Sequence, residues 1–408
     1  MKRIGIEAIN LYGGSLYLDQ MKLAEARGQD PAKVVSDFLI DTRSLNPPFE
    51  DTVTMAANAA KPLFDYAELS DVGMLIVGTE GSVDFGKPIS TNIHGALGLP
   101  SSVRNYETKH ACYSGVAALD SAINWIASGL NHGKKALVIS TDFSRMHLGA
   151  KEEFVLGGVA AALLVSDSPR VVEYELERRG TWTTNAYDTF RPSARAEVGN
   201  NEVSLFTYMD AIEGAFGEFS RNSQGGVDFD TDFEHLNYHT PFPGMAFQAH
   251  RTLCNISKRR SKPEVISDFE RRVAPGLKFA RRVGSTYGSS NFVGIASLFS
   301  EDSVRAGSRI GFFAYGSGAI GEFYSGIACA EASEVVGRMD IGAHLDDRIE
   351  VSVELYEKIE QERESYIELP TFSPTPDAVP GLFETSYDGK KRLVLRNVEN
   401  YYRSYEWS

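Results

Sequence analysis

The sequence has little cysteine, no long apolar run and no overall excess of positive charge. It contains only three cysteines, Cys112, Cys254 and Cys329. An odd number at wide spacing excludes a disulfide-stabilised scaffold and a thiolate metal cluster. The longest uninterrupted apolar stretch, residues 159–165, is far shorter than the ~20 residues that cross a bilayer, so we expect no membrane interaction. Glu7 and Asn10 interrupt the segment where a secretion signal would be apolar, and we expect a cytoplasmic protein.

The formal net charge is −14, which argues against general binding of nucleic acid. The charge is unevenly placed, because residues 251–282 carry ten Lys and Arg against three acidic residues, a local +7. Such a run is often a solvated helical face. The alternative is a docking patch for an acidic partner or a phosphate, with Arg259, Arg260 and Lys262 at its centre.

Apolar runs alternate with amphipathic stretches along most of the chain, which is typical of layered α/β architecture. The pattern predicts strands at 3–8, 73–77, 136–141, 160–165, 309–314 and 321–328. It predicts helices at 53–63, 88–97, 114–127, 205–220, 243–256, 262–273 and 291–300. Residues 348–365 read as an acidic helix with a solvated face, and residues after 390 as a final strand and turn. Two α/β halves, 1–168 and 169–408, follow from the break near residue 168.

Cys112 lies at the expected N-terminus of a helix, because Val116, Leu119, Ile123 and Ile126 after it are spaced for one helical face. The unpaired N–H groups and the positive end of the dipole favour a thiolate there, so Cys112 is a candidate nucleophile. A buried cysteine that acts only as a small apolar residue is the alternative.

Two further residues follow strand-like segments. Glu80 comes directly after the apolar run 74–78 and His239 after a strand-like approach that ends in a Pro-rich turn. The carboxyl ends of strands carry the chemistry of α/β sheets, which makes Glu80 a candidate for proton transfer. A solvated carboxylate and a structural histidine are the alternatives, and any pairing of His239 with Cys112 must come from the fold.

A glycine motif at 316–321 matches the dinucleotide-binding pattern G-x-G-x-x-G. The residues after it alternate like a strand, whereas a nucleotide site needs a helix that receives the phosphates. We therefore predict a tight turn between antiparallel strands. His235 and His239 have the spacing of helical metal ligands, but Pro241 and Pro243 disfavour a helix, and we expect no metal site.

Taken together, these segments resemble the 3-hydroxy-3-methylglutaryl-CoA (HMG-CoA) synthase family of the thiolase superfamily. The resemblance is carried by GTEG at 78–81, KHACYSG at 109–115, STDFSR at 140–145, AYDTFRP at 186–192, YHTPFPGM at 238–245 and AYGSGAIGEF at 314–323. The opening GIEAINLYGGSLYLD and the segment DFGKPISTNIH are closer to the branch of bacterial polyketide pathways, which installs β-branches on substrates held by acyl carrier proteins.

The resemblance implies a thiolase-like fold of two related α/β halves packed as αβαβα layers, and a homodimer. It implies Cys112 as nucleophile, Glu80 as general acid/base and His239 as ligand of the acceptor carbonyl. Further substrate-binding residues are implied around them: Tyr113, Asp188, Ser204, Pro241, Ser285, Gly316 and Gly318. At Ser285 the family usually has asparagine, and a hydroxyl has a shorter reach than an amide.

The implied reaction condenses a Cys-bound acetyl group with a β-ketoacyl thioester, giving a 3-hydroxy-3-carboxymethyl acyl product. Donor and acceptor would be acyl carrier proteins or CoA, which present substrates on phosphopantetheine, and no permanently bound cofactor is needed. One alternative is a decarboxylating or acyl-transferring condensing enzyme of the same superfamily, organised by a His–Asn pair. Another is a non-catalytic carrier-binding partner that retains the fold.

Overall fold

The structure is a computed structural model that describes residues 3–301 and 304–408. The strands are β1 (Gly5–Tyr12), β2 (Leu16–Asp19), β3 (Thr42–Leu45), β4 (Val72–Gly78), β5 (Arg104–Thr108), β6 (Lys135–Phe143), β7 (Gly158–Ser166), β8 (Val172–Thr183), β9 (Thr189–Phe190), β10 (Val198–Gly199), β11 (His235–Tyr238), β12 (Arg309–Gly316), β13 (Ile320–Ala328), β14 (Ile349–Glu350), β15 (Leu393–Glu399) and β16 (Tyr402–Trp407). Nine of them form one sheet, in the order β11-β12-β13-β8-β1-β7-β6-β4-β5.

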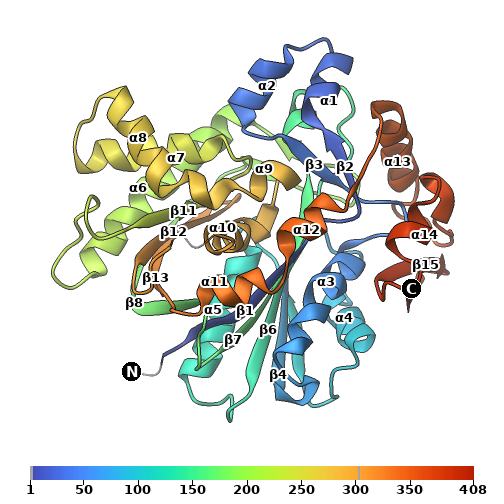
Figure 1. Ribbon diagram of the computed structural model, residues 1–408, viewed down its shortest axis with the longest axis horizontal. Coiled ribbons are helices and arrows are strands. Elements are labelled where there is room, and N and C mark those ends of the chain that lie inside the picture. The colour runs from blue at the N-terminus through green and yellow to red at the C-terminus, as the bar shows by residue number, and fades with distance from the viewer. Residues whose placement is uncertain (1–2, 302–303) are drawn as a thin grey trace.

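The helices are α1 (Gln20–Ala26), α2 (Pro31–Phe38), α3 (Thr52–Ala60), α4 (Ile89–Leu97), α5 (Ser114–Ala127), α6 (Asn201–Asn222), α7 (Met245–Ser257), α8 (Lys262–Arg272), α9 (Ala280–Val283), α10 (Ser290–Phe299), α11 (Ala332–Gly337), α12 (Ile341–Asp346), α13 (Val353–Ser365) and α14 (Leu382–Ser386). Every residue of α10 is buried, and Figure 1 shows this helix at the centre of the molecule. None of the described helices is long and apolar enough to span a bilayer.

The two halves of the large sheet repeat one pattern of pairing. In the first half β4 pairs with β6 in parallel, and β6-β7-β1 continues antiparallel. In the second half β11 pairs with β12 in parallel, and β12-β13-β8 continues antiparallel. The halves join where β1 pairs with β8. Strands β4 and β11 are therefore equivalent. Helices α5 and α10 are equivalent too, because each directly precedes the strand that pairs in parallel with β4 or β11.

The periodicity predicts these elements well where a buried run is continuous. The six predicted strands correspond to β1, β4, β6, β7, β12 and β13, and the predicted helix 114–127 coincides with α5. Strand β1 extends to Tyr12 because Ile9 and Leu11 continue its buried run. The glycine motif at 316–321 forms the turn between the antiparallel strands β12 and β13, as predicted.

Two expectations about the C-terminal region need correction. The acidic helix α13 is not simply solvated, because Tyr356 and Ile359 are buried in a core with Leu16 and Val394. The guanidinium of Arg43 also lies over the Tyr356 ring, 4.4 Å from its centroid. The last residues form the hairpin β15-β16 rather than one strand and a turn. Both features attach the C-terminal region to the first half.

Candidate active site

Cys112 lies in the turn that begins α5, as the sequence predicts. Its charge state differs from the expectation, because the pKa of the thiol lies well above its ordinary value. Burial is the main cause, and the carboxylates of Glu80 and Asp142 add to it more than Arg191 offsets it. The helix end alone is too weak to overcome these effects. The resting protein therefore holds a thiol at Cys112.

Glu80 follows the end of β4 and shares its surroundings with Asp142, at the corresponding end of β6. Asp142 Oδ1 accepts hydrogen bonds from the Thr79 hydroxyl and from the backbone N–H groups of Glu80 and Gly81, at 2.9, 3.0 and 3.0 Å. Burial raises the pKa of both carboxyls, and for Asp142 burial and the Glu80 charge raise it to about 8. The pair therefore holds a proton near neutral pH.

Sequence reasoning missed Asp142 as a site residue. The available signal is topological: Asp142 ends a strand parallel to the one before Glu80, and the carboxyl ends of parallel strands meet at one edge of a sheet.

The short hairpin β9-β10 places a second unpredicted group at the site. Arg191 Nη2 lies 3.4 Å from Glu80 Oε1 and 2.6 Å from Glu197 Oε2. Glu197 in turn lies 3.5 Å from His147 Nε2. Burial raises the pKa of Glu197, but the neighbouring His147 and Arg191 outweigh it and lower this pKa to about 2. No periodicity in the sequence marks this hairpin, since each strand has two residues.

His239 follows β11, the strand equivalent to β4. Its backbone N–H donates to the Phe313 carbonyl at 2.6 Å, and its own carbonyl accepts from the Tyr208 hydroxyl at 2.7 Å. The side chain is buried, and Nε2 has no hydrogen-bond partner among the described residues. Burial lowers the pKa of His239 to about 3. The imidazole is neutral at physiological pH and can donate a hydrogen bond, but it is not a cationic acid.

Tyr315 connects His239 with the glycine turn. Its ring centroid lies 6.1 Å from that of His239, and its hydroxyl donates to Asp188 Oδ2 at 2.6 Å. The buried Asp188 also accepts from the backbone N–H of Gly318 at 2.9 Å. Gly316 packs on the Cys112 turn so closely that an added Cβ would lie 2.6 Å from the His110 carbonyl oxygen. Asp188, Gly316 and Gly318 thus border the candidate nucleophile.

Ser285 lies in the loop that leads into α10, after Gly284, whose φ of 80° favours glycine. The next residue, Thr286, has a buried hydroxyl without a described partner. The same loop contacts the start of α5, since a Cβ on Gly115 would lie 2.3 Å from the Gly288 carbonyl oxygen. The loops before the two equivalent helices therefore meet at the site.

The other predicted substrate-binding residues lie at different positions. The Tyr113 hydroxyl donates to Glu322 Oε2 at 2.6 Å, in a network with Arg179 and not toward His239. Pro241 lies in the turn between β11 and α7. Ser204 lies in the first turn of α6, and no hydrogen bond between described residues joins its hydroxyl to the loops around Cys112.

The basic segment 251–282 is partly neutralised by acidic residues from elsewhere in the chain. Arg260 bonds to Asp230 and lies 3.6 Å from Asp268, and its side chain is only 14% exposed. Other ion pairs engage Arg271, Arg272, Lys278, Arg281 and Arg282. Four exposed residues of the segment have no ion pair with a described residue: Arg251, Lys258, Arg259 and Lys262.

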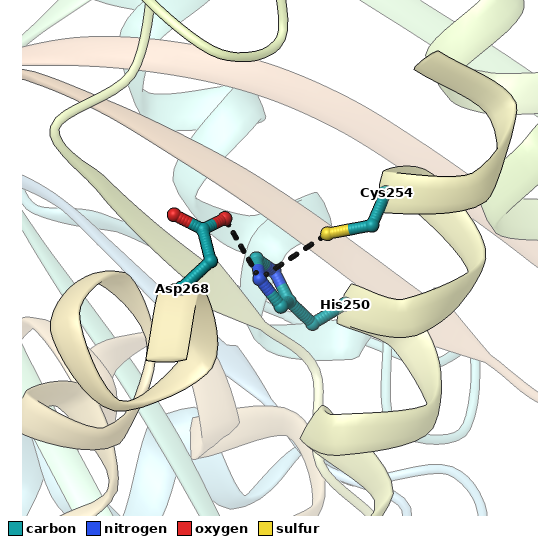
Figure 2. A group of neighbouring side chains, drawn as sticks. All are labelled: His250, Cys254 and Asp268. Atoms are coloured by element: carbon teal, nitrogen blue, oxygen red, sulfur yellow. Dashed lines mark hydrogen bonds and ion pairs between the residues drawn. The ribbon is translucent and has the colours of Figure 1, made fainter. Parts of the chain in front are cut away.

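Figure 2 shows three potential metal-ligating side chains: His250 and Cys254 from α7, and Asp268 from α8. His250 Nε2 lies 3.1 Å from Asp268 Oδ2 and 3.4 Å from Cys254 Sγ. Arg272 already donates to the same Asp268 oxygen at 3.0 Å, and this cation competes with a metal for the charge. The cluster instead supports the fold, because His250 Nδ1 also lies 3.1 Å from the Tyr238 hydroxyl, next to His239.

Comparison with known proteins identifies the family of this chain. The chain matches the family models for the N-terminal part of hydroxymethylglutaryl-coenzyme A synthase over residues 1–169 and for the C-terminal part over residues 248–407. It is 36% identical to the polyketide biosynthesis 3-hydroxy-3-methylglutaryl-ACP synthase PksG of Bacillus subtilis, over all of both chains. It is 32% identical to hydroxymethylglutaryl-CoA synthase of Enterococcus faecalis, over 87% of this chain and 90% of the relative.

Among solved structures, the HMG synthase of the curacin biosynthetic pathway superposes with a TM-score of 0.95 at 37% identity, over all of both chains. PksG superposes with a TM-score of 0.93 at 37% identity, over 99% of both chains. These matches confirm the predicted thiolase-like α/β fold. Since the family models and full-length relatives agree, this chain belongs to the hydroxymethylglutaryl-CoA synthase family.

Proposed function

We propose that the protein is an HMG-synthase-type acyltransferase of polyketide β-branching. It condenses an acetyl group on Cys112 with a β-ketoacyl thioester on an acyl carrier protein. The observation that carries this proposal is that the Glu80–Asp142 carboxyl pair acts on Cys112 at the carboxyl end of β4. His239, whose Nε2 has no hydrogen-bond partner among the described residues, follows the equivalent strand β11. The curacin HMG synthase, similar over its full length, has been solved with apo, holo and acetyl donor-ACP.

The first step transfers acetyl from the pantetheine sulfur of the donor to the sulfur of Cys112. The resting Cys112 is a thiol, so it loses a proton as it attacks, and the departing pantetheine sulfur gains one. The transfer therefore needs no net uptake of protons. The backbone N–H groups near Cys112 and in the turn 316–318, other than that of Gly318, which donates to Asp188, are the candidate donors to the thioester oxygen.

In the second step the Glu80 carboxylate removes a proton from the methyl group of acetyl-Cys112. The enolate attacks the β-ketone of the acceptor, and the new alkoxide takes a proton from Glu80. Neutral His239 donates a hydrogen bond from Nε2 to this oxygen and stabilises its growing charge. The raised pKa of Glu80 suits both directions of transfer, because a base is most effective near the working pH. Water then cleaves the thioester and frees the Cys112 thiol.

The carboxyl pair distinguishes this reaction from that of a decarboxylating condensing enzyme, which needs a His–Asn pair and no base. Mixing the protein with an acetyl-loaded carrier tests the proposal directly. Intact mass should show one acetyl group, mapped to Cys112, and addition of a β-ketoacyl carrier should release it as product. A chain that binds the carrier without becoming acetylated would be a non-catalytic partner.

We propose that the four exposed cations Arg251, Lys258, Arg259 and Lys262, here called the basic patch, dock the acidic carrier proteins or the phosphate of their pantetheine arm. Arg260 was expected to take part, but its ion pairs with Asp230 and Asp268 leave it little free charge. An exposed patch of this kind acts mainly on the rate of association, because opposite charges steer the encounter.

Reversing Lys258 and Arg259 to glutamate should lower the association rate of the donor carrier about fivefold at low salt. The difference should shrink at physiological salt, where charges are screened over ~8 Å. Stopped-flow binding measures both effects. Lys390→Glu/Lys391→Glu is the matched control, because these two lysines are also adjacent, exposed and without an ion pair among the described residues. Equal effects of the two double variants would remove the basic patch from carrier docking.

We also propose that the protein is a homodimer that pairs through β5. This strand forms one edge of the nine-stranded sheet and is only partly buried, and an unpaired edge is a template for a second copy. Near it, the Phe85 side chain is 95% exposed. Light scattering at micromolar concentration should give twice the mass of one chain. Tyr106→Pro removes a hydrogen-bond donor from the edge strand and should lower the measured mass. A single-chain mass for the unaltered protein would reject the dimer.

A further inference from the structure

Two guanidinium groups beside Glu80 have more donors than partners. Arg191 Nε donates to Glu197, and Nη2 lies 3.4 Å from Glu80 Oε1. Both Nη1 and Nη2 are buried, and neither has a hydrogen-bond partner among the described residues. Arg145 Nε is also buried and unpartnered, and no salt bridge joins Arg145 to a described carboxylate. Unmet donors of this kind are uncommon in native proteins and call for an explanation.

The two arginines also repel each other. Burial and the charges of Arg191 and Arg363 lower the pKa of Arg145, and Glu364 and Tyr287 offset only part of this. Arg191 lies over the Tyr287 ring, 5.5 Å from its centroid. Bringing cations together away from water costs free energy unless an anion compensates them. Glu80 and Glu197 already compensate Arg191, but no described carboxylate lies within ion-pair distance of Arg145. The uncompensated charge of Arg145 beside Arg191 therefore fits an anion that is present for part of the reaction cycle.

The proposed condensation and hydrolysis create one lasting anion near Cys112 and Glu80. The acetyl group, the ketone and the acceptor thioester are neutral, and the enolate exists only briefly. Hydrolysis of the Cys112 thioester, however, forms a carbon–oxygen bond from water and breaks the carbon–sulfur bond. One proton of the water goes to the Cys112 sulfur and the other to solvent, and a carboxylate remains. Cys112 and Glu80 both lie within the electrostatic field of Arg191.

We propose that Arg145 and Arg191 form a carboxylate-binding site that receives the carboxylate of the product when it leaves Cys112. This inference rests on the proposed function. The planar guanidinium matches a carboxylate with two parallel hydrogen bonds, which an ammonium group does not reproduce. The site draws the new charge away from Glu80 and Asp142, whose own carboxyls would otherwise repel it.

The experiment compares two probes that differ only at their end, S-glutaryl-pantetheine and the thioester of the same length with a terminal amide. Binding is measured by calorimetry in the Cys112→Ala background, so that neither probe is transferred to the cysteine. The glutaryl probe should bind at least about tenfold more tightly than the amide, as expected for a charge-assisted pair. Arg145→Met and Arg191→Met should each reduce this ratio toward one by weakening only the glutaryl probe. Arg145→Lys should retain part of it.

Arg363→Met is the matched control, because Arg363 is a neighbouring guanidinium that is already paired with Glu360 at 2.6 Å. This variant should keep the full preference for the carboxylate. Equal affinity for the two probes in the Cys112→Ala chain would overturn the inference, and so would an unchanged ratio in both Arg145→Met and Arg191→Met. If one methionine variant does not fold, the other decides. Acetylation of Cys112 in the unaltered chain tests the proposed function separately, so the two failures are distinguishable.

Discussion

Cys112→Ser should abolish acetyl transfer, with turnover reduced by at least about 10³-fold. A serine hydroxyl is far less acidic than a thiol, and the carboxyls that raise the pKa of Cys112 would disfavour an alkoxide even more strongly. Intact mass after incubation with an acetyl-loaded carrier measures the first step, and product release measures turnover. Cys329→Ser is the control, since Cys329 lies after β13 near Arg3 and away from these carboxyls. Turnover within tenfold of the unaltered chain would exclude Cys112 as nucleophile.

The raised pKa of Cys112 adds a second measurable effect. Only the thiolate reacts with iodoacetamide, so the alkylation rate at Cys112 should still be rising at pH 9. A thiolate stabilised by the helix end alone would instead reach its plateau near neutral pH. An early plateau would show that the field of α5 outweighs the burial and the carboxyls of Glu80 and Asp142.

Glu80→Gln should still accept acetyl but should not condense it. Acyl transfer needs the sulfur of Cys112, whereas carbon–carbon bond formation needs a base that removes a methyl proton. We expect acetyl-Cys112 to accumulate and condensation to fall by about 10²–10⁴-fold, the usual contribution of general acid–base catalysis. Single-turnover assays with a preloaded chain separate the two steps.

Glu107→Gln is the matched control for this variant. Glu107 is a partly buried carboxyl on the neighbouring strand β5, where it accepts a hydrogen bond from the Ile89 N–H at 2.9 Å. Its loss should leave condensation close to normal. Normal condensation by Glu80→Gln would assign the base elsewhere, with Asp142 as the first candidate. Failure of a folded Glu80→Gln chain to accept acetyl would give Glu80 a role in the first step as well.

The sequence predicts the parts of the site that end a regular element. Glu80 follows β4 and Cys112 precedes α5, two elements that periodicity predicts. The four-residue strand β11 before His239 is recognised from the sequence only as a strand-like approach. Arg145 and Arg191 both lie in irregular segments, Arg191 directly after the two-residue strand β9, so only the packed structure brings them together. The pKa of Cys112 could not be predicted either, because it depends on burial and on Asp142 from another strand.

The free charge of the basic segment 251–282 could not be predicted from the sequence either. Counting charges along residues 251–282 gives a strongly positive segment. Folding brings Asp230, Asp41 and Asp346 against it from distant parts of the chain. The net charge of a segment therefore overstates the free charge that it offers to a partner.

The close contact between Gly115 and Gly288 sets the distance between the two halves of the site. Mutation can therefore change this distance without changing any reacting side chain. The halves share one sheet through β1 and β8 and one hydrophobic core, and the glycine contact spans them beside Cys112. A single methyl group at either glycine would act as a wedge between the first half, which carries Cys112 and Glu80, and the second half, which carries His239, while every reacting group stayed unchanged. Substitutions there could thus make a protein that carries all the expected catalytic residues yet loads acetyl without condensing it. In relatives of this chain, an intact set of catalytic side chains is therefore not sufficient grounds for inferring turnover.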